Sequence, residues 1–390
     1  MPKVVAPRKR FPNRNGNSNG NGTFPTFTGP APQVHTKPAF YDYTLSKEHL
    51  QTKNNTDAVF EKEVIDRSTA LQLSEQTSEK IVEFTKKVIA ALNLEKEQNT
   101  VPDVVIEQIA AVGSLITKTA IISTEKSDIV VQLSTLPSFE TVSALGNKVA
   151  DNIKSANGKD VCSSVAQDYG CCIMSPNVQV RILITILPEN STKLEPGLHL
   201  NNQVMMINFF SMRHMNWFIS LEKSDEELYK ELIILIRVLK DVRNRFPAIQ
   251  PLSIWALQYL AFYCLANGPN RQRVNLGTAF RRFFEVIAAG IFLPRTPVLL
   301  DPMSTQYRIG FDLTYAQMDV LCMAAQTLVR IFATGNDGYR AILGTLELPS
   351  HIDMTRDETL WHGITIKPSK SAFTATCMEP YLPEEGKEEK

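Results

Sequence analysis

The sequence predicts an α+β fold, in which a mixed-sheet lobe is followed by an all-helical lobe. Short segments with β-branched or alternating apolar residues occur between residues 104 and 207, and helical periodicities precede and interrupt them. After residue 208 long helical patterns follow one another. With 390 residues, 43% of them hydrophobic, the chain can bury a substantial core. We expect an N-terminal arm (1–40), an α/β lobe (41–207), a helical lobe (208–365) and a C-terminal tail (366–390).

The two ends of the chain have biased compositions. Residues 1–40 are rich in Asn, Gly, Pro and Arg, contain six Lys or Arg and no acid, and offer little apolar surface to offset the entropy of ordering. They predict a disordered basic arm, which is either a solubilising tail, a nuclear localisation signal at residues 7–10, or a weak phosphate-contacting arm. Residues 366–390 are rich in Pro, Lys and Glu and predict a flexible acidic tail.

The predicted α/β lobe begins with two helices between Asp57 and Leu94, separated near Ser74. A third, amphipathic helix spans residues 136–156. Four strands are expected, at 104–113, 128–133, 178–187 and 198–207. Together these elements predict a mixed sheet with helices between its strands.

The second lobe is predicted from four helical segments, at 227–246, 251–268, 276–292 and 314–335. The first is amphipathic, and its polar stripe includes Arg237, Lys240 and Asn244. The second opens with Pro251 and is apolar nearly all round, so it should lie in the core.

The overall composition argues against several classes of protein. The 41 basic and 41 acidic residues cancel, so the chain as a whole is attracted neither to nucleic acid nor to an anionic membrane. The longest nearly apolar run, 254–266, is shorter than the ~20 residues that cross a bilayer. Six cysteines without Cys-x-x-Cys spacing, and histidines scattered among them, predict a reduced compartment and no structural zinc.

A candidate nucleotide site lies between the first two predicted strands. The Gly113-Ser114 turn suits a triphosphate, because glycine lets the backbone approach closely and serine adds a hydroxyl. Acids alternating on the next strand would hold divalent metal ions against the phosphates. Here Asp128 stands at the head of that strand, but Lys126 occupies the position two residues before it. A cation therefore stands where a metal ligand is needed.

Several longer segments resemble the DZF family, whose domain is associated with zinc fingers. They are "LPSFETVSALGNKV" from 136, "LIRVLKDVRNRFP" at 235–247, "PLSIWAL" at 251–257, "AAGIFLP" at 288–294 and "AAQTLVRI" at 324–331. The similarity runs from about residue 40 to 370. It implies a fold similar to the template-free nucleotidyltransferases, which include the oligoadenylate synthetases.

The resemblance also implies that the site has lost two of its three catalytic acids. Asp128 matches the second acid of active relatives and Lys126 replaces the first. The third is expected within 198–207, where Asn201, Asn202 and Gln203 stand. We therefore expect a pseudoenzyme with no catalytic residue, no metal and no cofactor, although residual nucleotide binding is compatible with the pattern.

The residues expected to contact such a nucleotide are Gly113, Ser114, Asp128 and Lys240. Lys240 matches a triphosphate-facing lysine of the synthetase-like relatives. The alternatives are that Lys240 belongs to an exposed helical stripe and that Gly113-Ser114 is an ordinary turn.

The resemblance further supplies a partner and a cellular setting. It implies a heterodimer with a larger DZF-domain protein that carries double-stranded RNA-binding domains, with RNA bound mainly through the complex, in the nucleus. Two other functions stay open. One is an active nucleotidyltransferase that uses Asp128 with Glu125 or Glu107, and the other is a stand-alone RNA-binding module.

The segment 313–334 carries more apolar residues than one amphipathic stripe needs. The surplus fits burial against another chain or burial wholly within its own lobe, and the resemblance, in which the C-terminal lobes pair, implies that this segment forms the dimer interface. The candidate interface residues are Leu313, Met318, Leu321, Leu328 and Phe332.

Two smaller sets of residues are more ambiguous. The arginines at 271, 273, 281 and 282 predict either a basic edge for RNA or, more simply, a solvated face. His199 and His214 lack partners at metal-ligand spacing, so both are interpreted as structural.

Overall fold

The computed structural model describes residues 56–268, 272–294, 296, 298–349, 351–370 and 372. The predicted basic arm at 1–40 and the end of the predicted acidic tail lie outside these residues.

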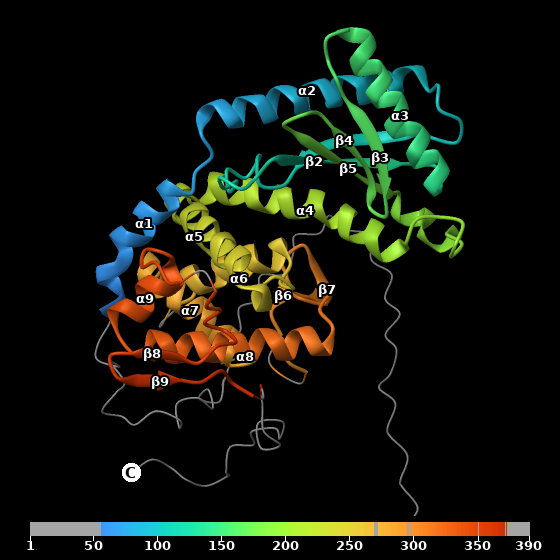
Figure 1. The fold of residues 1–390 in the computed structure, drawn as a ribbon. Helices are drawn as coiled ribbons and strands as arrows, with labels where there is room; N and C mark the ends of the chain where they lie inside the picture. The colour runs from blue at the N-terminus through green and yellow to red at the C-terminus, as the bar shows by residue number, and fades with distance from the viewer. Residues whose placement is uncertain are drawn as a thin grey trace, which may run out of the picture. The chain divides into compact units, whose positions relative to one another are not determined.

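The α/β lobe is built on a five-stranded sheet in the order β1-β2-β5-β4-β3 (Figure 1). Only β2 and β5 run parallel to each other, and the other neighbouring pairs are antiparallel. The sheet is therefore mixed, and the predicted fold class is confirmed. The strands are β1 (Ile106–Val112), β2 (Lys126–Leu133), β3 (Ser163–Gln167), β4 (Gly170–Met174) and β5 (Gln179–Ile186).

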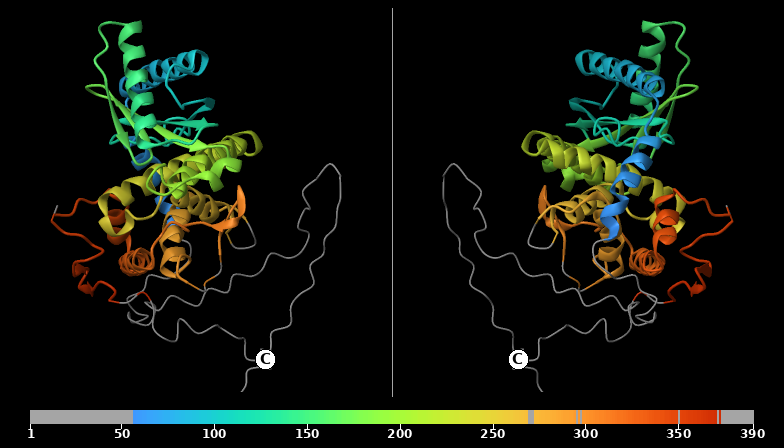
Figure 2. Two further views of the ribbon diagram at one scale, coloured as in Figure 1. Left: turned by 90° about the vertical axis from the view of Figure 1, so that its right-hand side faces the viewer. Right: turned by 90° about the vertical axis from the view of Figure 1, so that its left-hand side faces the viewer.

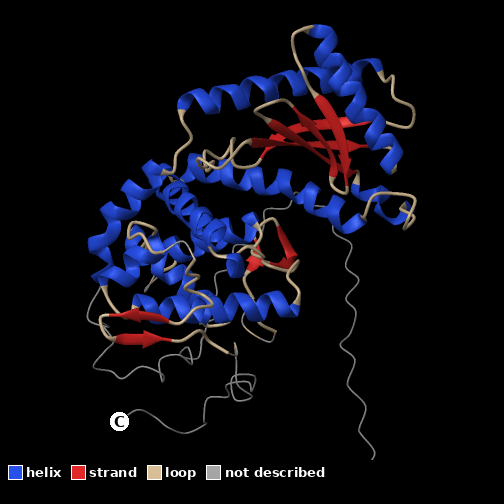
Figure 3. Ribbon diagram, in the orientation of Figure 1, coloured by secondary structure: helices blue, strands red, loops and turns tan. Residues whose placement is uncertain are grey.

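Helices cover both faces of this sheet, as Figures 2 and 3 show. The helices α2 (Glu75–Gln98) and α3 (Phe139–Ala156) pack on one face, and α4 (Asn202–Ser224) packs on the other. The side chains of successive β2 residues point to opposite faces of the sheet. Ile129 and Val131 join the core beneath α2 and α3, whereas Val130 contacts the cluster that includes Met212 and Met215 of α4.

The predicted helix boundaries in this lobe agree with the local capping chemistry. The Ser74 side chain accepts a hydrogen bond from the Thr77 amide and begins α2, so the predicted break at Ser74 is confirmed. Ser138 and Thr141 form a reciprocal capping box that begins α3. The predicted strands at 104–113, 128–133 and 178–187 correspond to β1, β2 and β5.

The strand predicted at 198–207 is wrong, because most of this stretch begins α4. The Asn201 side chain accepts from the Gln203 amide as the N-cap. Buried residues then recur at helical spacing, at Met205, Met212 and Met215. The apolar residues that alternate between 198 and 207 span too few positions to distinguish the period of a strand from that of a helix. The expected lobe boundary at residue 207 falls inside this single helix.

The second lobe is a helical core to which η2 (Thr56–Phe60) and α1 (Glu61–Ala70) also belong, although they precede the sheet in sequence. Arg67 of α1 forms an ion pair with Asp241 of α5 at 2.9 Å. The remaining helices of this lobe are α5 (Glu226–Arg245), α6 (Ile254–Ala266), α7 (Leu276–Ala288), α8 (Tyr315–Phe332) and α9 (Asn336–Leu343).

The sequence patterns did not predict several short elements. In the helical lobe they are two hairpins, β6 (Leu300–Asp301) with β7 (Ser304–Arg308), and β8 (Thr359–Trp361) with β9 (Ile364–Ile366). In the α/β lobe it is the hairpin of β3 and β4. The start of the predicted flexible tail is packed rather than loose, since Ile366 belongs to β9 and the side chain of Ala372 is buried. No described helix is both long and apolar enough to cross a membrane.

Candidate functional site

A cavity of about 760 Å³ lies where the end of β1 and the start of β2 face the helical lobe. Its lining comes from the loop after β1, from β2 and β5, and from α4, α5, α6 and the segment 308–312. Three of the predicted nucleotide contacts, Gly113, Ser114 and Asp128, line it. Lys240, the fourth, lines it from α5. The structure therefore brings all four predicted residues to one cavity.

The loop after β1 has a defined conformation. Gly113 has a φ of +83°, in the region that favours glycine. A Cβ placed there would lie 2.7 Å from Oδ2 of Asp128, so a side chain would require the Asp128 carboxylate to shift. Ser114 and Thr119 close the loop through a hydrogen bond from the Thr119 amide to the Ser114 carbonyl (2.9 Å).

Asp128 is held in an ion pair with Arg181. The parallel register places these residues side by side on β2 and β5, and Nε of Arg181 donates to Oδ1 of Asp128 at 2.6 Å. Burial acts to lower the pKa of the Arg181 guanidinium, but the hydrogen bond and charge of Asp128 outweigh it and raise that pKa. The guanidinium also lies 5.8 Å from the ring centre of Tyr169.

The residues expected at the position of the third acid do not lie beside Asp128. The residue next to Asp128 on the parallel strand β5 is Arg181. The predicted residues Asn201, Asn202 and Gln203 are exposed at the start of α4 and do not line the cavity.

The described residues around Asp128 do not form a ligand set for a divalent metal ion. Lys126 lies two residues before Asp128 on β2, and Arg181 lies beside it, so two cations flank this carboxylate. Among the described residues no group of three His, Cys, Asp or Glu side chains could hold a metal. Hard cations such as Mg²⁺ require several oxygen ligands, which these residues do not supply.

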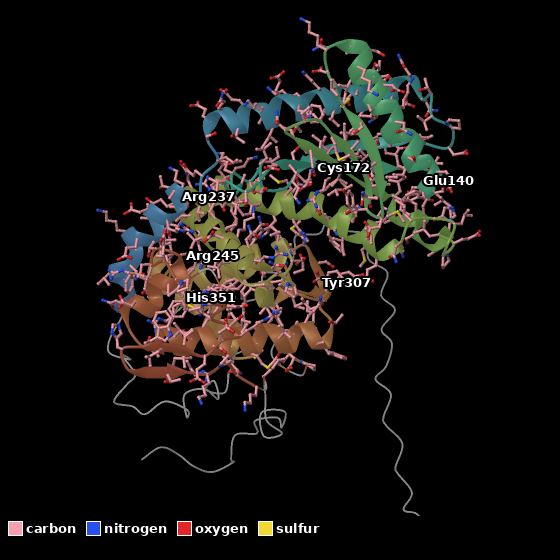
Figure 4. The ribbon with its side chains drawn as sticks, viewed as in Figure 1. Glu140, Cys172, Arg237, Arg245, Tyr307 and His351 are labelled. Carbon is pink, nitrogen blue, oxygen red and sulfur yellow. The ribbon has the colours of Figure 1, made fainter. Side chains whose placement is uncertain are left out.

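Lys240 is buried, so the alternative of an exposed helical stripe is wrong for this residue. Its side chain is 7% exposed, and Nζ donates to the Thr119 carbonyl at 2.8 Å. Burial lowers the pKa of Lys240 to about 8, against the opposing charge of Asp128. Arg237, one turn earlier on α5 and labelled in Figure 4, donates to the Lys118 carbonyl. Two cations of the helical lobe thus hold the loop that begins with Gly113.

The other end of the cavity contains an aromatic and acidic cluster that sequence reasoning missed. The His214 ring stacks on Trp255 with centroids 3.6 Å apart, and its Nε2 lies 2.7 Å from Oδ2 of Asp301. Trp255 Nε1 donates to the same Asp301 oxygen at 2.8 Å. Tyr307 of β7, labelled in Figure 4, contacts this region through Phe210.

Burial and the contacts within the cluster shift the pKa values of His214 and Asp301. Burial lowers the pKa of His214, although Asp301 opposes the change. Burial acts to raise the pKa of Asp301, but the hydrogen bonds from His214, the Met303 amide and Trp255, together with the charge of His214, outweigh it and lower that pKa. Because the three residues lie on α4, α6 and β6, no spacing in the sequence could have indicated the cluster.

The arginines at 271, 273, 281 and 282 were considered as a basic edge for RNA. The three that the structure describes do not form such an edge. Arg273 lies within 3.5 Å of Asp225 and within 3.3 Å of Glu231. Arg281 pairs with Asp57 at 2.7 Å, and Arg282 lies over the Tyr263 ring. Arg271 lies outside the described residues. Acids and rings of the same chain therefore already engage the three described side chains.

The five candidate interface residues lie inside the helical lobe. Leu321, Leu328 and Phe332 are completely buried, and Leu313 and Met318 are each 6% exposed. All five belong to the core of this lobe. The surplus of apolar residues on α8 is thus explained by burial on several sides within one chain. A pairing surface on this helix would need other residues, such as Tyr315, which is 77% exposed.

Solved structures with a similar fold are nucleotidyltransferases. Cid1 poly(U) polymerase is similar at 13% identity with a TM-score of 0.51, covering 74% of this chain and 99% of that chain. CdnC of E. coli MS115-1 with ATP has 15% identity and a TM-score of 0.49, covering 72% and 97%. A cytoplasmic RNA terminal U-transferase has 12% identity and a TM-score of 0.49, covering 74% and 98%.

These likenesses concern the fold, and the sequence itself matches two family profiles. The DZF N-terminal domain matches residues 23–223, and the DZF C-terminal domain matches residues 231–367. Together they cover the sheet, the cavity and most of the helical lobe. The chain therefore belongs to the DZF family, and its two domains form a nucleotidyltransferase-like fold.

Proposed function

We propose that this chain is a non-catalytic subunit that pairs with a larger DZF-domain protein carrying double-stranded RNA-binding domains. Its segments resemble interleukin enhancer-binding factor 2, a member of this family, and this resemblance supports a nuclear role in RNA metabolism and transcriptional or post-transcriptional regulation. The chain stabilises and orients the partner, through which RNA is mainly bound.

The ion pair between Asp128 and Arg181 is the observation that carries the non-catalytic assignment. Metal-assisted phosphoryl transfer requires carboxylates that hold divalent ions against the phosphates. The cavity instead places Arg181 against Asp128 at 2.6 Å and Lys126 on the same strand. The acids suggested for a rearranged ligand set do not support activity, since Glu107 and Glu125 are exposed and neither lines the cavity.

The same residues support metal-free binding of a nucleotide. Lys126, Arg181 and Lys240 line the same cavity as the Gly113-Ser114 loop, and Arg181 is paired with the Asp128 carboxylate. Phosphate oxygens can be bound directly by such side chains and by backbone amides. A nucleoside triphosphate is therefore the ligand we propose for this end of the cavity.

Incorporation of labelled nucleotide into RNA, with Mg²⁺ or Mn²⁺, tests the assignment. The wild-type chain should give no product and should bind a fluorescent triphosphate equally well with and without EDTA. Metal-dependent extension that disappears in Asp128→Ala would show an active enzyme instead.

A double substitution makes this test sharper. Lys126→Asp with Arg181→Asp places two carboxylates beside Asp128, and the variant should gain Mn²⁺ binding that the wild-type chain lacks. The matched control, Lys126→Gln with Arg181→Gln, removes the cations without adding ligands. If the wild-type chain binds Mn²⁺ in the cavity as well as the double variant does, the assignment is wrong.

Recovery of the partner from nuclear extract, with and without nuclease, tests the pairing. A partner retained after nuclease treatment is bound through protein contacts. Loss of the partner on nuclease treatment would favour the alternative of a stand-alone RNA-binding module, whose affinity should fall steeply with salt.

A further inference from the structure

Arg330, on the buried side of α8, is a cation for which no carboxylate partner is found among the described residues. Its side chain is 8% exposed. Nη2 donates to the hydroxyl of Ser369 at 2.9 Å and lies 3.4 Å from the Thr327 hydroxyl, while Nε has no hydrogen-bond partner. Burial lowers the pKa of this guanidinium. A buried charge without a counter-charge is costly, so this environment favours an anion.

Two other arginines in the described part of the chain have the carboxylate partner that Arg330 lacks there. Nε of Arg67 and Nε of Arg281 are also buried without a well-formed hydrogen bond. Each of these guanidinium groups nevertheless faces a carboxylate, Asp241 at 2.9 Å and Asp57 at 2.7 Å. The partners of Arg330 within the described residues are two neutral hydroxyls.

Ser369, whose hydroxyl accepts a hydrogen bond from Arg330, lies in a segment that is hydrogen-bonded to α8. The Ser369 amide donates to the Thr327 hydroxyl at 3.0 Å, and Gln326 donates to the Ala372 carbonyl at 2.8 Å. Ser369 is half-buried, and its neighbour Lys370 is exposed. The segment 367–370 follows β9 directly.

The stereochemistry of arginine connects these observations. Nε and one terminal nitrogen present two parallel N–H groups, a fork that matches two oxygens of a phosphate or carboxylate. The Ser369 oxygen already meets Nη2 of Arg330, and the unpartnered Nε belongs to the same guanidinium. A phosphoryl group on this oxygen would bring further acceptor oxygens to the unpartnered nitrogen.

We propose that Ser369 is a phosphorylation site and that Arg330 binds the phosphoserine through both nitrogens. A serine kinase would transfer the γ-phosphoryl group of ATP. The bond from Oγ to phosphorus forms as the bond from phosphorus to the ADP oxygen breaks, ADP leaves, and the hydroxyl proton passes to the kinase base. The modification locks the segment 367–370 onto α8, and it is independent of the cavity and of the function proposed for it.

The experiment uses the full chain with phosphoserine introduced at position 369 during translation, compared with the unmodified chain. The second pKa of free phosphoserine is about 6, and pairing with Arg330 should lower it by about one unit, as followed by ³¹P resonance against pH. The amides of residues 367–370 should exchange with solvent at least about tenfold more slowly than in the unmodified chain.

Two variants separate the phosphate contact from general stability. Arg330→Lys keeps the charge but loses the fork, and Arg330→Gln loses both. In the phosphorylated chain the lysine variant should retain part of the pKa change and the glutamine variant none, with circular dichroism showing that both are folded. If either variant fails to fold, the ³¹P pKa of the phosphorylated parent chain still decides. A value of about 6, or exchange that is not slowed by the phosphate, overturns the proposal and leaves Arg330 to a carboxylate from outside the described residues.

Discussion

Arg181 stands directly beside Asp128 on the adjacent parallel strand and donates from Nε to Oδ1 at 2.6 Å. This contact joins β2 to β5 at the cavity and gives the Asp128 carboxylate a cationic partner. The same pair therefore affects both the stability of the sheet and the reactions that the cavity can support.

Replacing Arg181 with Gln should destabilise the chain by about 2 kcal/mol. The side chains of Arg181 and Asp128 are 32% and 15% exposed. The cost should thus lie between that of a surface pair, about 0–1 kcal/mol, and that of breaking a buried pair, about 3–5 kcal/mol. Denaturant unfolding measures the change in free energy. The control is Lys230→Gln, which breaks an exposed pair with Glu226 and should leave the midpoint unchanged.

A second substitution tests whether the cost comes from the carboxylate left without a partner. Adding Asp128→Asn to Arg181→Gln removes the unpaired charge and should recover part of the lost stability. If the double variant is as unstable as the sum of the two single variants, the two residues do not act as a pair.

Gly113→Ala should destabilise the chain more than Gly197→Ala. Both glycines have positive φ, +83° and +85°, so both substitutions carry a similar backbone cost. At Gly113 the added Cβ also meets the Asp128 carboxylate at 2.7 Å, whereas nothing lies within 4 Å at Gly197. The difference between the two unfolding free energies measures the crowding. Equal values would mean that the Asp128 side chain moves aside freely.

Lys240 should make the stability of the chain depend on pH in alkaline solution. Burial lowers the pKa of Lys240 from 10.5 to about 8. Between these values the unfolded chain binds more protons than the folded chain, so the free energy of unfolding contributed by this group rises with pH. Lys240→Gln should remove that rise. Denaturant midpoints at about pH 8 and about pH 10 measure it, and parallel slopes in both proteins would show that Lys240 does not titrate in this window.

The sequence predicted the parts of the site that depend on local chemistry. The Gly113-Ser114 turn and Asp128 could be recognised because a strand, a turn and a second strand follow one another within a short segment. Ser74 and Ser138 likewise begin helices through contacts with residues three positions later. Each of these features is decided by neighbours in the chain.

The parts that depend on register and packing could not be predicted. Arg181 is 53 residues from Asp128, and only the parallel pairing of β2 and β5 brings them together. His214 and Trp255 lie on different helices and meet only after folding. The stretch 198–207, which contains the start of α4, was misassigned because the alternation in a short window also fits the start of a helix with one buried face.

The final prediction concerns the pairing surface, because α8 was expected to supply it. Leu328 is completely buried in the core of the helical lobe, so Leu328→Glu places a carboxylate among apolar side chains and should unfold the lobe. Val320, on the same helix, is only partly buried, and Val320→Glu should leave the circular dichroism spectrum unchanged.

The comparison of these two variants tests pairing without confusing it with folding. If the solvent side of α8 contacts the partner, Val320→Glu should reduce co-purification of the partner at least about tenfold, since a charge opposing an apolar interface costs more than about 1.4 kcal/mol. Val320→Ala is the matched control, because it shortens the side chain without adding charge. Undiminished recovery of the partner by a folded Val320→Glu chain would place the pairing surface on another side of the helical lobe, since the residues first expected to form it face the core of their own chain.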